Sequence, residues 1–318
     1  MDAIGMREQI LNFPRQLAAD LPVVNAENLP PADKFILCGL GGSALGGGLL
    51  KTYRPELDLL IHRDYGLPRV PKYFLEGSLL ILSSYSGETE EVLDTLRCAS
   101  ARGLKLSVLA AGGLLLEEAK KLRLPYVILP AGLPPRLAVG YSFVGLGRLV
   151  GDEKLRSDLA AASVIAPAVL EPQGESLAGS LAGKLPVVYS STVNLALAYN
   201  WKIRLNETAK TAAFFNVLPE MNHNELAAAD PHFSYIFLRD SADDLRIQNR
   251  FSRLAELFRS RGLTVAEVEL EDAAPLAKIF YSVILADWTS YHLALLTHRD
   301  PVGVPAIEDF KKLIKAPI

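Results

Sequence analysis

Short apolar runs that alternate with helix-like segments constrain the fold of this 318-residue chain most strongly. In the first half, such runs occur at residues 34–40, 57–64, 78–84, 105–112 and 125–132. Continuous apolar runs of this length are typical of parallel strands that are buried on both faces of a sheet. The sequence therefore predicts an α/β fold in which parallel sheets are flanked by helices.

The same strand–helix order begins again in the second half of the chain. Further strands are predicted at residues 185–191, 234–240 and 263–270, each followed by a helical pattern. A chain of this length has room for two domains. We therefore expect one domain at residues 1–153 and a second at residues 154–318, each a parallel sheet flanked by helices, with a linker near 151–156.

Charge and composition argue against several classes of protein. The net charge of -3 gives no basic surface for nucleic acid, and the only cysteines, Cys38 and Cys98, have no spacing typical of a metal site. The five histidines also lack the HxH and HExxH spacings of metal ligands, so we expect no metal and no cofactor. No apolar run reaches 18 residues and no leader pattern is visible, which predicts a cytoplasmic protein without a membrane span.

Two strand-to-helix turns carry the residues of greatest chemical interest. The first, GLGGSALGG at residues 39–47, offers free backbone amides at Gly42 and one hydroxyl at Ser43. The second, SSYSGETEE at residues 83–91, is rich in hydroxyls. In parallel sheets ligands bind beyond the carboxyl ends of the strands, and helix N-termini attract phosphate. Together the two turns predict a phosphate site built from neutral donors.

Two alternatives remain open for these turns. Serine and threonine are common helix caps, so the hydroxyls have a structural explanation. Gly39-x-Gly41-x-x-Ala44 also fits a loose dinucleotide fingerprint, with Asp64 as the ribose acid, although that interpretation leaves the hydroxyl cluster unexplained. Glu88, Glu90 and Glu91 suit a helix N-terminus, and they would repel a phosphate unless their carboxylates point away.

At these turns the chain resembles the sugar isomerase domain family, and over nearly its whole length it resembles one branch, the bifunctional phosphoglucose/phosphomannose isomerases of archaea and bacteria. The matching stretches appear in family order from residue 39 to residue 312: GLGGSALGG, SSYSGETEE, PPRLAVGY, NETAK, PEMNHNE and PAIEDFKK. The resemblance implies two sugar isomerase domains, a homodimer with active sites at the interface, and no cofactor. It implies interconversion of glucose 6-phosphate and fructose 6-phosphate through a cis-enediol.

The resemblance also implies roles for individual residues. It assigns Glu207 as the base between C1 and C2, Arg136 as the group that stabilises the enediolate, and His223 with Lys311 as the pair that opens the sugar ring. The residues that match the phosphate-binding hydroxyls are Ser43, Ser84, Ser86 and Thr89.

These residue types suit an aldose–ketose isomerisation, since a carboxylate can move protons, an arginine stabilises negative charge and a histidine residue in general titrates near neutrality. From the residues alone, however, Glu207 could simply form a surface ion pair with Arg204, three residues earlier on a predicted helix.

Position 304 departs from relatives that act on both sugars. Those relatives tend to have threonine before the proline, whereas this chain has Val304, which cannot hydrogen-bond a sugar hydroxyl. We therefore expect mannose 6-phosphate to be a minor substrate at most. A non-catalytic phosphosugar-binding or regulatory module is the alternative function, but a binder would need the serines and not the base. We expect the apolar residues of 279–296 to contribute to the dimer interface.

Overall fold

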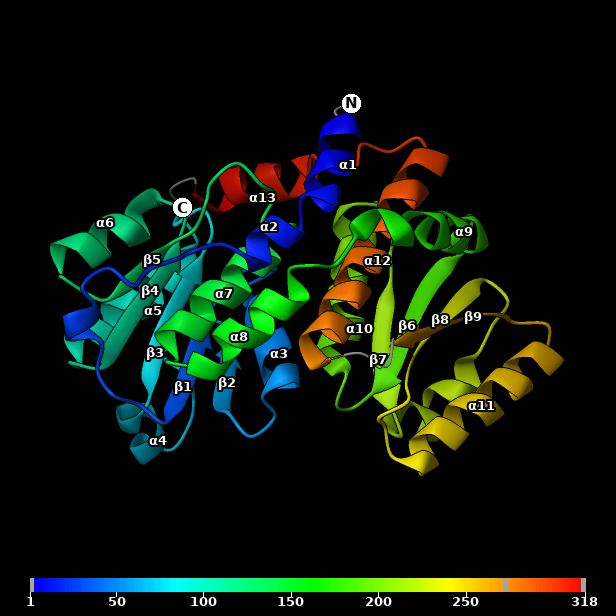
Figure 1. The fold of residues 1–318 in the computed structure, drawn as a ribbon, viewed down its shortest axis with the longest axis horizontal. Helices are drawn as coiled ribbons and strands as arrows, with labels where there is room; N and C mark the ends of the chain where they lie inside the picture. Colours follow the sequence, from blue (N-terminus) through cyan, green and yellow to red (C-terminus); the bar gives the residue numbers. More distant parts are fainter. Residues whose placement is uncertain (1–2, 271–273, 316–318) are drawn as a thin grey trace.

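The structure is a computed structural model that describes residues 3–270 and 274–315, and it has two lobes, each built on a parallel sheet (Figure 1). The first sheet has strand order β2-β1-β3-β4-β5 and the second β7-β6-β8-β9, and every pair of neighbouring strands is parallel. The predicted α/β class and the two parallel sheets are confirmed. The strands are β1 (Lys34–Cys38), β2 (Asp58–His62), β3 (Leu79–Ser84), β4 (Lys105–Ala110), β5 (Tyr126–Ile128), β6 (Leu185–Ser191), β7 (Phe214–Leu218), β8 (Phe233–Asp240) and β9 (Thr264–Leu270).

Helices cover the sheets and fill the space between the lobes. The first lobe carries α1 (Ala3–Leu11), α2 (Pro14–Leu17), α3 (Gly42–Tyr53), α4 (Lys72–Gly77), α5 (Glu90–Ala101), α6 (Gly113–Lys121) and α7 (Val139–Leu149). The chain continues through α8 (Glu153–Ala162), α9 (Glu171–Leu181), α10 (Leu195–Glu207), α11 (Leu245–Ser260), α12 (Pro275–Leu296) and α13 (Pro305–Lys315). Four short 3-10 helices are η1 (Ala26–Asn28), η2 (Pro167–Leu170), η3 (Glu220–His223) and η4 (Glu225–Ala228).

Helix α8 occupies the region in which a linker was expected. It begins at Glu153, and its N-cap Asp152 accepts a hydrogen bond from the Leu155 amide at 3.1 Å. A side-chain oxygen at this position satisfies one of the free amides of the first helical turn. The linker expected at residues 151–156 is therefore mostly helix, and the boundary that we propose between residues 153 and 154 falls at its beginning.

Helix α12 lies between the two lobes and joins their cores. Phe280 packs against Phe13 and Phe143 of the first lobe, with ring centroids 5.6 and 5.1 Å apart. Trp288 on the same helix is buried and donates a hydrogen bond to the Pro167 carbonyl at 2.8 Å. The expectation that the apolar residues of 279–296 contribute to a dimer interface is therefore wrong for most of them, because all but a few, such as Leu295 and Leu296 at the end of the helix, pack inside the chain itself.

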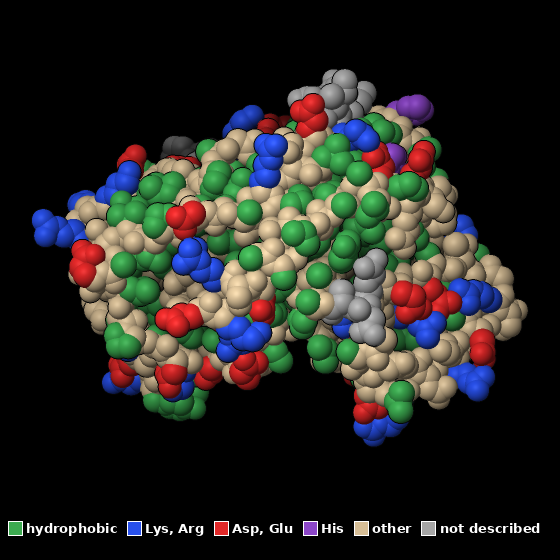
Figure 2. Space-filling view, in the orientation of Figure 1, with side chains coloured by type: hydrophobic (Ala, Val, Ile, Leu, Met, Phe, Trp, Pro, Cys, Tyr) green, Lys and Arg blue, Asp and Glu red, His purple; other side chains and the backbone are tan. Residues whose placement is uncertain are grey.

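Helix α12 is also long and apolar enough to cross a membrane, but 78% of its most apolar window is buried within the protein. We interpret it as a core helix, since core helices pass the same test of length and apolarity. In the space-filling view a notch separates the two lobes at the lower edge of the molecule (Figure 2).

Candidate active site

The two predicted phosphate turns lie side by side because β1 and β3 are neighbours in the sheet. The Ser83 hydroxyl donates to the Ser43 carbonyl, and the Tyr85 amide donates to the Ser43 hydroxyl, both at 2.9 Å. These bonds lock the beginning of α3 against the loop that leads into α5. The two turns are thus joined by hydrogen bonds at the carboxyl edge of the sheet.

Within the second turn the hydroxyls differ in how many hydrogen bonds they already form inside the loop. Ser84 is buried, its hydroxyl is 2.7 Å from that of Thr89, and it accepts a hydrogen bond from the Gly87 amide at 3.0 Å. Ser86 is exposed, and among the described residues its hydroxyl only accepts a hydrogen bond, from the Glu88 amide at 3.2 Å. Since a hydroxyl can both accept and donate, Ser86 keeps a free donor for a phosphate oxygen.

The carboxylate of Glu88 points away from this turn. Its Oε1 accepts a hydrogen bond from the Leu114 amide, at 3.0 Å, in the first turn of α6. A carboxylate at a helix N-terminus is stabilised by the free amides there. The repulsion that Glu88 could exert on a phosphate is thereby reduced.

Arg136 is buried and reaches the second lobe. It lies between β5 and α7, its side chain is 1% exposed, and its Nη1 is 3.4 Å from the Glu207 carboxylate. Its Nε donates to the Thr208 hydroxyl at 2.9 Å, and its Nη2 donates to the carbonyls of Pro301 and Val302 at 2.8 and 3.0 Å. One guanidinium therefore joins the first lobe to the end of α10 and to the segment before α13.

Burial lowers the pKa of Arg136 below its usual value, while the negative charges of Glu207 and Asp287 act in the opposite direction. An arginine starts from so high a pKa that it stays cationic at neutral pH. Glu207 is less buried, with 21% of its side chain exposed. The arrangement places an accessible carboxylate beside a fixed positive charge, as an enolisation site requires.

Gly42 allows the loop that carries Pro135 and Arg136, here called the arginine loop, to pack against the first phosphate turn. A Cβ at this position would lie 2.6 Å from the Pro135 carbonyl carbon and 2.7 Å from the Arg136 amide nitrogen. Only glycine allows two backbones to approach so closely. Whether the Gly42 amide also contacts phosphate remains a proposal, but its lack of a side chain already serves the packing of the two loops.

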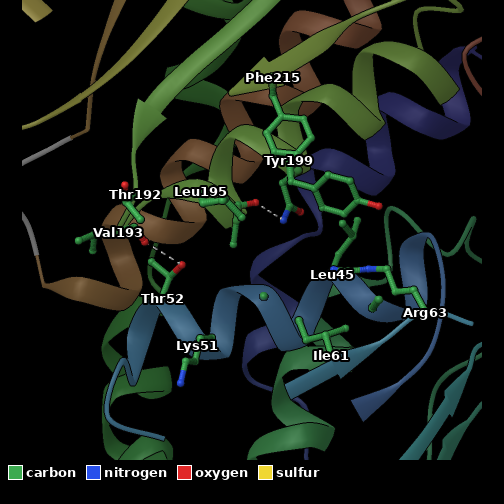
Figure 3. Close-up of a pocket in the computed structure, with 14 residues that line it drawn as sticks. Leu45, Lys51, Thr52, Ile61, Arg63, Thr192, Val193, Leu195, Tyr199 and Phe215 are labelled. Carbon is green, nitrogen blue, oxygen red and sulfur yellow. Dashed lines mark hydrogen bonds between the residues drawn. The ribbon is translucent and has the colours of Figure 1, made fainter. Parts of the chain in front are cut away.

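Helices α3 and α10 run side by side in opposite directions (Figure 3). The Thr52 hydroxyl at the end of α3 donates to the Val193 carbonyl before α10, at 3.4 Å, and a Cβ on Gly48 would lie 3.1 Å from the Ala196 Cβ. Consequently the beginning of α3, with Ser43, lies toward the end of α10, with Glu207. The antiparallel pair thus carries the predicted phosphate anchor and the predicted base at neighbouring ends.

A pocket with a volume of about 410 Å³ lies along this helix pair (Figure 3). Its lining is mainly apolar, and the Arg63 guanidinium lies 5.3 Å from the centre of the Tyr199 ring, a cation–π contact. None of the predicted catalytic or phosphate-binding residues lines it. We therefore distinguish this pocket from the candidate active site.

A buried network behind the site was missed in the sequence. Arg204 is fully buried and donates to Asp287 at 2.7 Å, to the Asn200 side chain at 2.8 Å and to the Arg136 carbonyl at 3.1 Å. The alternative in which Glu207 pairs with Arg204 is therefore wrong, because Arg204 faces the core and Glu207 faces Arg136. A buried arginine with three partners holds the backbone of Arg136 in place.

The structure does not bring every predicted residue together. His223 lies in η3 after β7 and Lys311 lies on α13; both are exposed, and no hydrogen bond or ion pair joins either of them to Glu207 or Arg136 in the described part of the chain. Val304 is nearer to the network, since it follows directly on the segment whose carbonyls Arg136 binds. Its own carbonyl accepts from the Ile307 amide in the first turn of α13, at 3.0 Å.

Thr208 and Lys210 join the site although the sequence did not single them out as functional. Thr208 is buried and orients Arg136, and Lys210 lies beside Glu207 with its Nζ 2.5 Å from the Glu207 carbonyl. Both belong to the NETAK stretch. Their place in that stretch, beside Glu207, was the only indication of a role.

Comparison with known proteins relates this fold to a class of proteins. The family model "Bacterial phospho-glucose isomerase C-terminal SIS domain" matches residues 171–314. Among solved structures, tagatose-6-phosphate ketose/aldose isomerase from Escherichia coli is similar in fold, with a TM-score of 0.69 and 16% identity over 93% of this chain and 94% of that one. Residues 171–314 thus match a sugar isomerase domain, and the chain shares its fold with a solved ketose/aldose isomerase.

Curated relatives define the family more narrowly. The bifunctional phosphoglucose/phosphomannose isomerase of Caldicellulosiruptor bescii is 33% identical over 96% of this chain and 98% of its own length. The enzyme of the same name from Aquifex aeolicus is 31% identical over 91% of this chain and 93% of its own. The chain belongs to the bifunctional phosphoglucose/phosphomannose isomerase family, and the resemblance described from its motifs is confirmed. The predicted class of enzyme, an isomerase, is confirmed with it.

Proposed function

We propose that the protein interconverts fructose 6-phosphate and glucose 6-phosphate by moving a proton between C1 and C2 through a cis-enediol. The observation that carries the proposal is the Glu207 carboxylate held 3.4 Å from the buried Arg136, whose backbone packs against Gly42 in the first of the two hydroxyl-bearing turns. Glu207 takes the proton from one carbon and returns it to the other, and Arg136 stabilises the negative oxygen that forms in between.

The experiment is to incubate the purified protein with fructose 6-phosphate and identify the products by NMR. We expect glucose 6-phosphate as the main product, and conversion slower by about two to four orders of magnitude with a Glu207→Gln protein. A wild-type protein that binds fructose 6-phosphate without converting it would instead favour the non-catalytic binding module.

Phosphate anchoring is proposed to reside in Ser43, Ser84, Ser86 and Thr89, and Ser86 offers the cleanest test because the loop does not use its donor. Ser86→Ala should raise KM about 2- to 10-fold, the equivalent of one neutral hydrogen bond, with little change in kcat. Steady-state kinetics with fructose 6-phosphate measures both values. Ser100→Ala, an exposed serine on α5, is the control, and an unchanged KM in Ser86→Ala would remove Ser86 from the site.

The proposed substrate preference rests on Val304. An isomerase that serves both sugars must let the enediol accept its proton on either face of C2, and the relatives' threonine supplies a hydroxyl that Val304 lacks. A missing hydrogen bond in a buried site costs about 1–3 kcal/mol, or about 5- to 150-fold in rate. We expect mannose 6-phosphate to be a minor product of the wild-type protein.

Val304→Thr should accordingly raise kcat/KM for mannose 6-phosphate by a factor within that range, as measured by coupled assays with both aldoses. Val304→Ala, which changes volume without adding a hydroxyl, should not. Equal kcat/KM for the two aldoses in the wild-type protein would show that the valine does not discriminate.

We propose that the enzyme acts as a homodimer, because no hydrogen bond or ion pair among the described residues joins His223 or Lys311 to Glu207 or Arg136 within one chain. Helix α13 offers a surface for the second copy. Its apolar side chains Ile307, Phe310, Leu313 and Ile314 are between 42 and 72% exposed. Exposed apolar rows on an amphipathic helix are typical of association surfaces.

Leu313→Glu should therefore shift the protein from dimer to monomer in sedimentation velocity and lower its activity, since a charge on a buried apolar surface is strongly unfavourable. Lys312→Gln, on the same helix, is the matched control. A wild-type protein that is monomeric at micromolar concentration and fully active would contradict a shared active site.

A further inference from the structure

Lys210 occupies an unusual position immediately after the predicted base. It follows the end of α10 at Glu207. Its backbone has a φ of 56°, in the left-handed region that residues other than glycine rarely adopt. Its Nζ donates to the carbonyl of Glu207 at 2.5 Å and approaches that of Thr208 at 3.4 Å. The last carbonyls of a helix have no partner within the helix, so the ammonium caps the end that carries the base.

The charges around Lys210 come from three segments. The positive charge of Arg136 repels the Lys210 ammonium, and the negative charges of Asp300 and Glu207 attract it. Burial and the charge of Arg136 lower the pKa of Lys210, whereas Asp300 and Glu207 raise it. Asp300 is itself fixed, because its carboxylate accepts from the amides of Val302 and Gly303 at 2.9 and 3.2 Å.

We propose that Lys210 is a positioning residue for the reaction, whose protonated side chain fixes the last turn of α10 so that the Glu207 carboxylate stays facing Arg136. The proposal rests on the proposed function of Glu207 as the base. The ammonium also interacts favourably with the negative end of the helix dipole, which a neutral amine does not. A displacement of about 1 Å at a catalytic group can cost about 100-fold in rate, so loosening this turn should reduce turnover.

The test uses the full-length protein, fructose 6-phosphate and three variants. Lys210→Met should lower kcat about 10- to 100-fold and leave KM within about 3-fold, because the phosphate turns are untouched. Lys210→Arg, which keeps a cation that can reach the same carbonyls, should recover most of the loss. Lys202→Met, on the preceding turns of α10, is the control and should behave as the wild type. Circular dichroism and thermal unfolding of each variant show whether the fold is retained.

The pH profile separates this role from a structural one. The pKa of Lys210 is lowered, so the active, protonated form is lost as the pH rises through a value below that of an ordinary lysine. In the wild type kcat should therefore fall on the basic side. In Lys210→Arg that fall should move to higher pH, since a guanidinium keeps its proton.

A Lys210→Met protein with wild-type kcat would overturn the proposal and leave the proposed function standing. So would a Lys210→Arg protein with a lower kcat and an unmoved basic limb. A wild-type protein that does not convert fructose 6-phosphate would overturn the proposed function and this inference together.

Discussion

Replacing Glu207 by glutamine should lower kcat by about two to four orders of magnitude while the fold and the binding of fructose 6-phosphate are retained. Glutamine has nearly the shape of glutamate and can still accept a hydrogen bond from Arg136 at the present separation of 3.4 Å. It cannot accept the proton from C1 or C2, because an amide is not a base at neutral pH. The loss should therefore appear in kcat and much less in KM.

Initial-rate assays that detect glucose 6-phosphate measure kcat and KM, and a binding titration with fructose 6-phosphate measures its affinity. Glu117→Gln, an exposed position on α6, is the control for the general effect of removing a carboxylate. Turnover close to that of the wild type in Glu207→Gln would mean that the pair of Glu207 and Arg136 serves only to hold the two lobes together.

The largest effect on stability is expected for Asp287→Ala. Asp287 is 1% exposed and pairs with the fully buried Arg204 at 2.7 Å, which in turn binds the carbonyl of Arg136. Burial raises the pKa of Asp287, and the two arginines act against that rise. Removing the carboxylate leaves a guanidinium buried without its counter-charge, which costs about 3–5 kcal/mol in the free energy of unfolding.

Urea denaturation followed by tryptophan fluorescence measures the loss. The matched control is Glu256→Ala, which removes an acid from the exposed pair of Arg253 and Glu256, whose side chains are 72 and 63% exposed. An exposed pair contributes less than about 1 kcal/mol. Similar unfolding midpoints for the two variants would contradict the view that the buried pair supports the site.

The regular part of the fold could be predicted because apolar runs and glycine turns alternate throughout the first lobe. Strand β7 was missed, since Phe214–Leu218 is short, lies at the edge of its sheet and contains a polar Asn216. Helix α8 was partly taken for a linker because its beginning, around Glu153, is polar. Both segments are short and mix polar with apolar residues, so their own sequence does not specify a strand or a helix. Their secondary structure depends on tertiary contacts.

The candidate site could be predicted less fully, for a physical reason. From the residues alone the nearest partner of Glu207 is Arg204, but the helix turns Arg204 toward Asp287 in the core. Only the resemblance to a family pointed to Arg136, which is far away in the sequence. The roles of Thr208 and Lys210 depend on how the end of α10 meets the arginine loop, and a sequence contains no direct record of that geometry.

The most direct test of the account is the conversion of fructose 6-phosphate in deuterium oxide. If Glu207 carries the proton between C1 and C2, NMR should show deuterium at C2 in part of the glucose 6-phosphate, because the proton on the carboxyl group can exchange with solvent before it returns to carbon. The label should appear with the wild-type protein, and Glu207→Gln should form no product in the same time. Glucose 6-phosphate with deuterium at C2 formed equally well by Glu207→Gln would contradict a proton transfer through Glu207.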